Sequence, residues 1–166
     1  MGEGVYLPCN KSIKVMDIKK MTEYISKNGT SNSMRGEDKD CAVRAVAAAF
    51  DVSYDTAHSF AETTWKRKRK RGTNTHLIVK TMEEVSNGRL MFNKKAEPAS
   101  TFNEYSTNKG VIKCKSKLST FANKNTKGTY FVLVRSHATV VKDGIVLDNY
   151  SPGSTVKYAW KINDVK

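Results

Sequence analysis

The chain has few of the residues and runs that are typical of membrane, secreted or metal-containing proteins. Its only cysteines are Cys9, Cys41 and Cys114, an odd number without paired spacing, so we expect free thiols in a reducing compartment. No apolar run is long enough to span a bilayer, and the N-terminus lacks the basic and apolar regions of a secretory signal. No Cys and His cluster has zinc-ligand spacing, so we expect no metal and no cofactor.

Acidic residues are also scarce beside the basic ones. The sequence has 29 Lys and Arg against 16 Asp and Glu, a net charge of +13. Six basic residues are consecutive, namely Lys66, Arg67, Lys68, Arg69, Lys70 and Arg71. Such an excess favours binding of nucleic acid or another polyanion through counterion release. The alternative is a solvated loop, since charge runs often have no specific ligand.

The apolar pattern predicts helices first and a sheet afterwards, in one globular domain over residues 1–166. Helices are predicted over residues 17–27, from Cys41 onwards, and over 54–64, 75–86 and 117–123. Strands are predicted over 89–92, 129–135, 138–141, 145–147 and 155–162, with an irregular stretch over 94–108. Asp143-Gly144 predicts a tight hairpin that pairs residues 145–147 with the strand of His137. The expected fold class is therefore α+β with an antiparallel sheet.

Cys41 lies at the start of an alanine-rich, apolar helix. The positive end of a helix stabilises a thiolate, which is the nucleophilic form of cysteine, and an imidazolium partner stabilises it further. The neighbouring Asp40 adds a negative charge that works against this, unless its carboxylate caps the helix.

His137 and then Asp148 follow in the apolar runs near the C-terminus. The predicted hairpin brings Asp148 or Asn149 close to His137, and only one can serve because adjacent strand residues face opposite sides. We prefer Asp148, since a carboxylate both fixes the imidazole tautomer and stabilises the imidazolium. The chain order of thiol, imidazole and carboxylate predicts a Cys41–His137–Asp148 triad.

Each triad residue also has a purely structural explanation. Buried free cysteines are usually inert, a lone strand histidine is commonly a core residue, and an aspartate before a turn is ordinary turn chemistry. The other histidines, His58 and His76, lie in helical stretches near the basic run without an evident partner. Only the set of three, in this order, favours catalysis.

Two parts of the sequence resemble small papain-like cysteine peptidase domains of bacteriophage and bacterial genomes. The first part has DCAVRA at residues 40–45 and SYD at 53–55; the second has LSTF at 118–121, KGTY at 127–130, SHA at 136–138 and DGIVLD at 143–148. The resemblance covers roughly residues 38–162 and leaves 1–37 as an N-terminal helix and loop elaboration.

The resemblance implies a papain-like fold, with the nucleophile on a central helix of a helical lobe and the histidine on an antiparallel sheet. It implies hydrolysis of a peptide or isopeptide bond, with Cys41 as nucleophile, His137 as general base and then acid, and Asp148 as its orienting partner. It further implies a phage protein that acts in the host cytoplasm or is carried in a virion.

The chain departs from this family in one respect. Papain-like peptidases usually place a Gln before the cysteine, where its amide stabilises the oxyanion, but this sequence contains no Gln. The backbone N–H of Cys41 is one possible donor, and Arg35 or Asn32 is a candidate for the second. Loss of one such donor typically costs about 10²–10³ in rate.

Two other functions stay open. The same triad would serve an acyl transferase, as in transglutaminase-like or arylamine acetyltransferase-like proteins. Alternatively, the triad is vestigial and the run from Lys66 to Arg71 makes the chain a nucleic-acid-binding accessory protein. The expected partners are thus a protein or peptide substrate and, through the basic run, nucleic acid or another polyanion, with no membrane.

Overall fold

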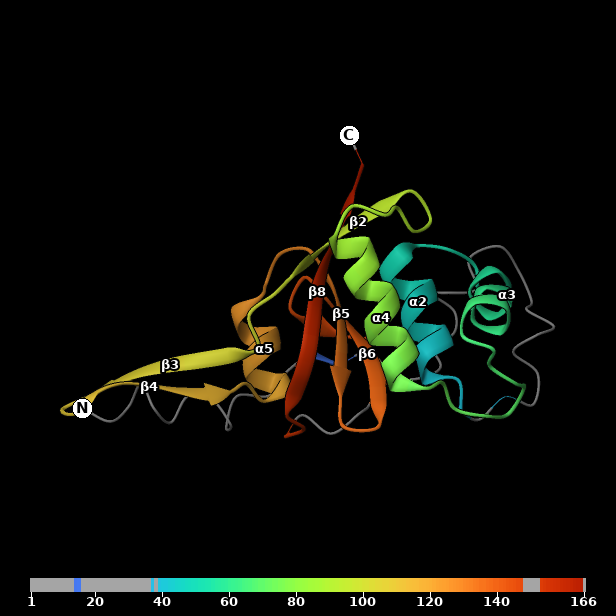
Figure 1. Cartoon of the computed structure of the whole chain (residues 1–166). Helices are drawn as coiled ribbons and strands as arrows, with labels where there is room; N and C mark the ends of the chain where they lie inside the picture. Colours follow the sequence, from blue (N-terminus) through green and yellow to red (C-terminus); the bar gives the residue numbers. More distant parts are fainter. Residues whose placement is uncertain (1–13, 16–36, 38, 148–152, 166) are drawn as a thin grey trace.

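The computed structural model describes residues 14–15, 37, 39–147 and 153–165 (Figure 1). The helices in these ranges are α2 (Cys41–Phe50), α3 (Tyr54–Thr64), α4 (Thr75–Ser86) and α5 (Leu118–Lys124). The strands are β1 (Lys14–Val15), β2 (Lys94–Pro98), β3 (Phe102–Thr107), β4 (Gly110–Lys115), β5 (Thr129–Val134), β6 (His137–Lys142), β7 (Ile145–Val146) and β8 (Val156–Asp164).

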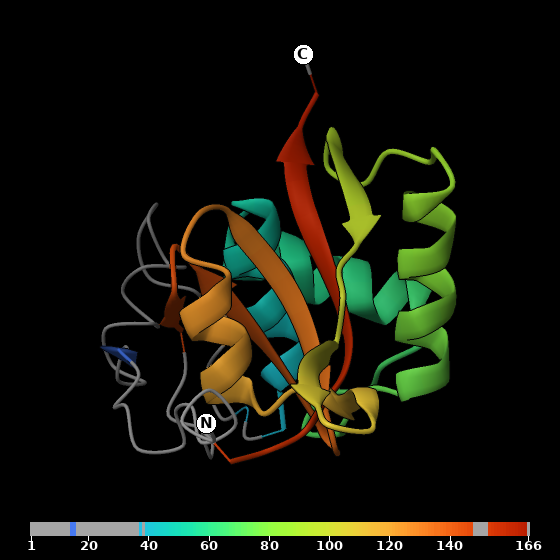
Figure 2. The same ribbon diagram turned by 90° about the vertical axis from the view of Figure 1, so that its left-hand side faces the viewer.

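Six strands form one sheet in the order β1-β7-β6-β5-β8-β2. Neighbouring strands are antiparallel, except that β1 runs parallel to β7. Helices α2 and α4 cover one face of this sheet, α5 lies on the other, and α3 packs beside α2 (Figures 1 and 2). The α+β class predicted from the sequence is confirmed.

Alternation along β5 lets both faces of the sheet bury apolar side chains. Phe131 and Leu133 pack in the cluster that contains α2 and α4, whereas Tyr130, Val132 and Val134 pack with α5. Strand residues one apart point to opposite faces, so this strand is buried on both sides. β5 is therefore the centre of the core and holds the neighbouring β6 in place.

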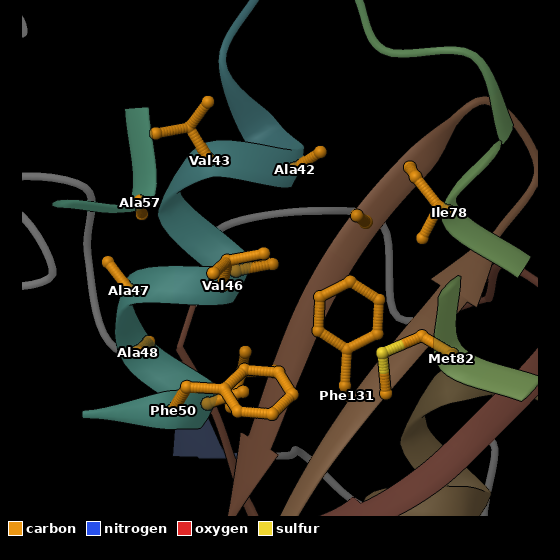
Figure 3. Packing of buried hydrophobic residues seen from close by; sticks show 14 of the residues in the cluster. Ala42, Val43, Val46, Ala47, Ala48, Phe50, Ala57, Ile78, Met82 and Phe131 are labelled. Carbon is orange, nitrogen blue, oxygen red and sulfur yellow. The ribbon is translucent and has the colours of Figure 1, made fainter. Parts of the chain in front are cut away.

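Helix α2 is thin and almost completely buried. Alanine supplies five of its ten residues, and all except Cys41 and Arg44 are buried. In Figure 3, Val46 and Phe50 point towards Phe131 of the sheet. Small side chains let the helix backbone approach the sheet closely, and the helix is buried on most sides.

Two tight turns fix the strand that carries His137. The predicted hairpin at Asp143-Gly144 is present, with φ of 50° and 78°, as a type I′ turn requires. It pairs Lys142 with Ile145 and Val141 with Val146, so residues 145–147 return along β6 as expected. A second turn joins β5 to β6 through Arg135 and Ser136, and Val134 pairs with His137 across it.

Helix α3 begins at Tyr54 and ends at Thr64, as the sequence pattern predicts. Ser53 caps its start, since the Thr56 backbone N–H donates to the Ser53 hydroxyl at 3.1 Å. Trp65 follows its last residue, is buried, and donates its indole N–H to the Thr81 hydroxyl at 2.9 Å. Trp65 therefore packs inward at the end of α3, and the basic run that follows it lies outside the helix.

The region after α4 is the least well predicted. The expected strand over 89–92 is wrong: Phe92 and Asn93 have positive φ, and Met91 makes only an isolated bridge to Lys94. The stretch expected to be irregular instead holds β2 and β3. Pro98 is compatible with β2 because that strand lies at the edge of the sheet, where a missing N–H is tolerated.

Strands β3 and β4 form a separate two-stranded ribbon that extends away from the body of the protein (Figure 1). Every residue of β4 is exposed, Val111 and Ile112 among them. Without an apolar face to bury, the ribbon lacks the alternation by which a strand is recognised in a sequence.

The predicted helix over 17–27 lies outside the described residues, as does nearly all of the 1–37 elaboration. Lys14 and Val15 of that elaboration do join the sheet, as strand β1 beside β7. Within the described ranges, no helix has both the length and the apolar character needed to cross a bilayer.

Candidate active site

Cys41 and His137 lie together where α2 and β6 begin. Cys41 is the first residue of α2, His137 is the first residue of β6, and the two elements pack against each other. A hydrogen bond joins the Cys41 thiol to the His137 side chain. Two of the three predicted triad residues are thus in direct contact.

The surroundings of Cys41 favour the thiolate. Burial by itself raises the pKa of the thiol. The hydrogen bond and charge of His137 and the backbone N–H groups of Ala138 and Ala42 act in the opposite direction, and the resulting pKa lies below its ordinary value. The Ala42 N–H belongs to the first turn of α2, where N–H groups have no partner within the helix.

The position of His137 depends on the turn that precedes it. Ser136 adopts a φ of 57°, which is uncommon outside glycine and turns the chain sharply into β6. Because Val134 pairs with His137, the histidine is attached to β5, a strand that is buried on both faces. The hydrogen bond to Cys41 therefore spans two well-anchored elements.

Asp40 occupies the N-cap position of α2, but its side chain makes no capping hydrogen bond. Its Oδ2 instead accepts from Arg44 Nε at 3.0 Å and from the Tyr54 hydroxyl at 2.7 Å. Burial and the Asp40 carboxylate raise the pKa of Tyr54, so this phenol stays protonated as a donor. The proposed capping role is wrong, and the Arg44 guanidinium offsets the negative charge that would oppose a thiolate.

A pocket of about 260 Å³ opens beside the Cys41–His137 pair. The start of α2, the loop before α4 and the β5–β6 hairpin line it. Ile78 and Leu133 contribute apolar surface, and Thr73 and Ser136 contribute hydroxyl-bearing side chains. Among the described residues, the Thr73 hydroxyl is one of few buried side-chain groups without a hydrogen-bond partner.

A buried ionic cluster ties the basic run to the segment before α2. Glu37 accepts from Arg67 Nη1 at 2.7 Å, from His58 Nε2 at 2.8 Å and from the backbone N–H of Lys70 at 2.6 Å. Burial alone would raise the pKa of Glu37, but these hydrogen bonds and the charge of Arg67 lower it from 4.5 to about 2. His58 also contacts Glu62 at 3.3 Å, so the expectation that it has no partner is wrong.

Arg67 is buried, unlike the other residues of the basic run. Its side chain is buried on Glu37, which removes it from any exposed basic surface. The other members of the run are exposed, namely Lys66, Lys68, Arg69, Lys70 and Arg71. The loop then continues to Gly72 and Thr73 at the pocket of Cys41, so the exposed cations lie close in sequence to the candidate site.

Several predicted residues lie outside the described residues: Asp148, Asn149, Arg35, Asn32 and Cys9. Cys114 is free and exposed on β4. Of the groups that the sequence analysis missed, the Asp40–Arg44 pair has a signal, because opposite charges four apart on a helix are neighbours. Glu37 and Arg67 are 30 residues apart, and no pattern in the sequence joins them.

Comparisons of the chain with protein-family models, with curated proteins and with solved structures gave no match in any of the three. The chemistry of the site is therefore inferred from the geometry of its own residues.

Proposed function

We propose that the chain is a cysteine-nucleophile hydrolase that cleaves a peptide or isopeptide bond. The observation that carries this proposal is the hydrogen bond between the Cys41 thiol and His137, at the junction of a helix start and a strand start beside a pocket. A thiol beside an imidazole is the arrangement in which a cysteine becomes an activated nucleophile.

In the proposed reaction the Cys41 thiolate attacks the carbonyl carbon of the substrate. His137 holds the proton taken from the thiol and delivers it to the leaving amine as the C–N bond breaks. A water molecule, deprotonated by His137, then releases the acid from the thioester and restores the thiol. The backbone N–H of Cys41, at the start of α2, is a natural donor to the oxyanion.

Thr73 is our candidate for the second oxyanion donor. It lines the pocket of Cys41, and its hydroxyl is buried without a hydrogen-bond partner among the described residues. Replacing it with valine should lower turnover by about 10²–10³ if the hydroxyl serves the oxyanion. Thr73→Ser should recover most of the rate, whereas equal loss in both variants points to packing.

Asp148 is the proposed orienting partner of His137. Residues 145–147 run antiparallel to β6, and the Leu147 N–H donates to the Val140 carbonyl at 2.9 Å. At Leu147 the chain is therefore heading towards the end of β6 at which His137 lies, which supports a role for the next residue.

A papain-like fold of the bacteriophage type, acting in a host cytoplasm or in a virion, belongs to the same proposal. The nucleophile heads a buried helix that packs on a largely antiparallel sheet, and the histidine begins a central strand of that sheet. These features support the proposal, while the chain's lack of Gln remains its departure from that family.

The decisive experiment compares the alkylation of individual thiols by iodoacetamide in the native protein, resolved by mass spectrometry across pH. Cys41 should react faster than the exposed Cys114, keep its reactivity below pH 7, and slow in His137→Ala. His76→Ala, an exposed histidine of α4, is the matched control and should change nothing. Equal rates and equal pH midpoints for Cys41 and Cys114 would refute an activated thiolate.

Hydrolase and acyl transferase differ in the acceptor of the acyl group. Once a cleaved substrate is found, turnover in the presence of an added primary amine separates the two: a hydrolase gives the free acid, and a transferase gives the amide. In either case Cys41→Ala should abolish turnover while preserving the fold, and retained turnover would exclude Cys41 as the nucleophile.

Nucleic-acid binding is a second candidate function, favoured by the exposed cations between Lys66 and Arg71. It predicts binding of an oligonucleotide that weakens steeply with salt. Neutralising Lys68 and Arg69 should weaken this binding, and unchanged affinity would exclude the loop. Arg67 should be left intact, because it is bound to Glu37 inside the protein.

A further inference from the structure

Helix α2 begins after a residue that is suited to capping but does not cap it. Ser53 and Asn74, which precede α3 and α4, are extended, and each accepts a hydrogen bond from an N–H group of the first turn. Asp40 instead has φ −109° and ψ 21°, and its side chain makes no capping hydrogen bond. Because aspartate is one of the preferred capping residues, other groups must hold its carboxylate elsewhere.

Two side chains hold the Asp40 carboxylate away from the first turn of α2. Its Oδ2 atom accepts from the Tyr54 hydroxyl at 2.7 Å and from Arg44 Nε at 3.0 Å. Tyr54 is fully buried on α3, which packs beside α2, so its hydroxyl is held in place by a neighbouring helix. The Arg44 guanidinium carbon also lies 5.9 Å from the centre of the Tyr54 ring. The three side chains form one network that ties the residue before Cys41 to α3.

The capping that this network prevents would compete with the nucleophile. A capping carboxylate accepts from the N–H of the second or third residue of a helix, and these residues of α2 are Ala42 and Val43. The Ala42 N–H is hydrogen-bonded to the Cys41 sulfur. A carboxylate that took this N–H would remove a donor from the thiolate and bring a negative charge towards it, and both changes disfavour the ionised thiol.

We propose that Tyr54 and Arg44 are positioning residues of the candidate active site, which keep the Asp40 carboxylate off the start of α2 and so reserve the Ala42 N–H for the Cys41 sulfur. Both act through Asp40 rather than on the substrate. The inference rests on the proposed function, because it concerns the ionised thiol that attacks the substrate. It extends the site from the Cys41–His137 pair to a buried hydroxyl on α3.

Other titratable groups border this network, and they stay constant in the test. Helix α2 packs against α3, β5 and β6, and β5 carries no charged residue. From β6, His137 is hydrogen-bonded to the Cys41 thiol. From α3, the His58 ring lies 5.9 Å from the Tyr54 ring, and the carboxylate of Glu37, which precedes α2, also interacts with the Tyr54 phenol. Every variant below keeps His137, His58 and Glu37, so their titration is common to all of the curves.

The test follows the rate of Cys41 alkylation by iodoacetamide against pH in the native protein and in Tyr54→Phe, which removes the hydroxyl and keeps the ring. The released carboxylate should raise the pH midpoint of Cys41 by about 0.5–1 unit. At a pH below the midpoint, the rate should therefore fall about three- to tenfold. Tyr130→Phe is the matched control: Tyr130 is also buried, but it packs on the opposite face of the sheet, and its loss of a hydroxyl should keep the native midpoint. Thermal unfolding of each variant confirms the fold.

Asp40→Ala distinguishes positioning from packing. It removes the carboxylate, so it should not raise the midpoint, and adding Tyr54→Phe to it should cause no further change. A hydroxyl that only supports packing would lower the stability of the fold without moving the midpoint. Arg44→Gln releases the same carboxylate from its other donor and is the second variant. Its midpoint should rise when Asp40 is present and should rise by less in Asp40→Ala.

The outcomes separate this inference from the proposed function. A midpoint that Tyr54→Phe or Arg44→Gln leaves unchanged or lowers overturns the positioning role of that residue alone. A rise that is equally large in Asp40→Ala overturns the role of the carboxylate, and the inference with it. Labelling of Cys41 no faster than that of Cys114 in the native protein overturns the nucleophile and the positioning residues together.

Discussion

Replacement of Glu37 by glutamine probes the buried cluster that connects the basic run to the start of α2. The change keeps the shape of the side chain but removes the charge that Arg67 and His58 contact. Both the Glu37 and the Arg67 side chains are fully shielded from solvent, so Arg67 would be left as a buried cation without its counterion.

The size of the effect follows from the pKa of Glu37. That pKa falls from 4.5 to about 2 in the folded protein. Each pKa unit corresponds to about 1.4 kcal/mol, so the folded state stabilises the carboxylate by roughly 3 kcal/mol. Because glutamine still accepts one hydrogen bond, we expect Glu37→Gln to lower the free energy of unfolding at pH 7 by about 2–4 kcal/mol.

The pH dependence has a definite sign. A carboxyl whose pKa is depressed by folding contributes its full stability above the pKa of the unfolded chain and loses it as the pH falls. For Glu37 the loss takes place between about 4.5 and about 2. The difference in unfolding free energy between the native protein and Glu37→Gln should therefore be largest near neutrality and should shrink across this interval.

Urea unfolding followed by circular dichroism at pH 7 and at low pH measures both quantities. Glu62→Gln is the matched control, since Glu62 also contacts His58 but is 52% exposed, and its loss should change stability by less than about 0.5 kcal/mol. If Glu37→Gln is no more destabilising than Glu62→Gln at pH 7, the ion pair of Glu37 with Arg67 does not stabilise the fold as proposed. Alkylation of Cys41 should also slow in Glu37→Gln, because the loop leads to Thr73 in the pocket.

Three further substitutions test separate parts of the structure. Thr81→Val should cost about 1–3 kcal/mol of unfolding free energy, because it leaves the buried Trp65 N–H without its acceptor; a neutral result would show that water or another group replaces it. Gly144→Ala should cost about 1 kcal/mol by thermal unfolding, since its φ is +78° and the Ala122 carbonyl is 3.4 Å from the added carbon. Gly72→Ala, with no atom within 4 Å, is its control, and equal effects would contradict the strain. Asp148→Ala should slow alkylation of Cys41 more than Asn149→Ala does, and the reverse order would reassign the partner of His137.

The parts of the fold that the sequence predicts well are those with a local signature. Helix α3 has a capping serine and an inward tryptophan, and the β6–β7 hairpin has Asp143-Gly144. The proximity of Cys41 and His137 was predicted because the apolar pattern of the sequence marks both the start of the Cys41 helix and the strand near His137. Contacts between residues far apart in the sequence, such as that of Glu37 with Arg67, have no local sequence pattern that predicts them.

Failures of prediction also have physical reasons. The β3–β4 ribbon is exposed throughout β4, so it shows no alternation of apolar and polar residues. Arg67 is indistinguishable in the sequence from its basic neighbours, and only a buried carboxylate identifies it. Asp40 precedes a helix as capping residues do, yet its Oδ2 accepts from Arg44 and Tyr54 and its side chain does not cap the helix.

The alanines of α2 help to determine how far Cys41 lies from His137. Cys41 and His137 belong to different elements, so the separation of their side chains depends on how near the helix axis comes to the sheet. Ala42 and Ala45 are almost fully buried in a helix that packs on β6, so larger side chains there should force the helix or its neighbours to move. Residues without any functional group of their own thus help to set the distance between the Cys41 thiol and the His137 imidazole.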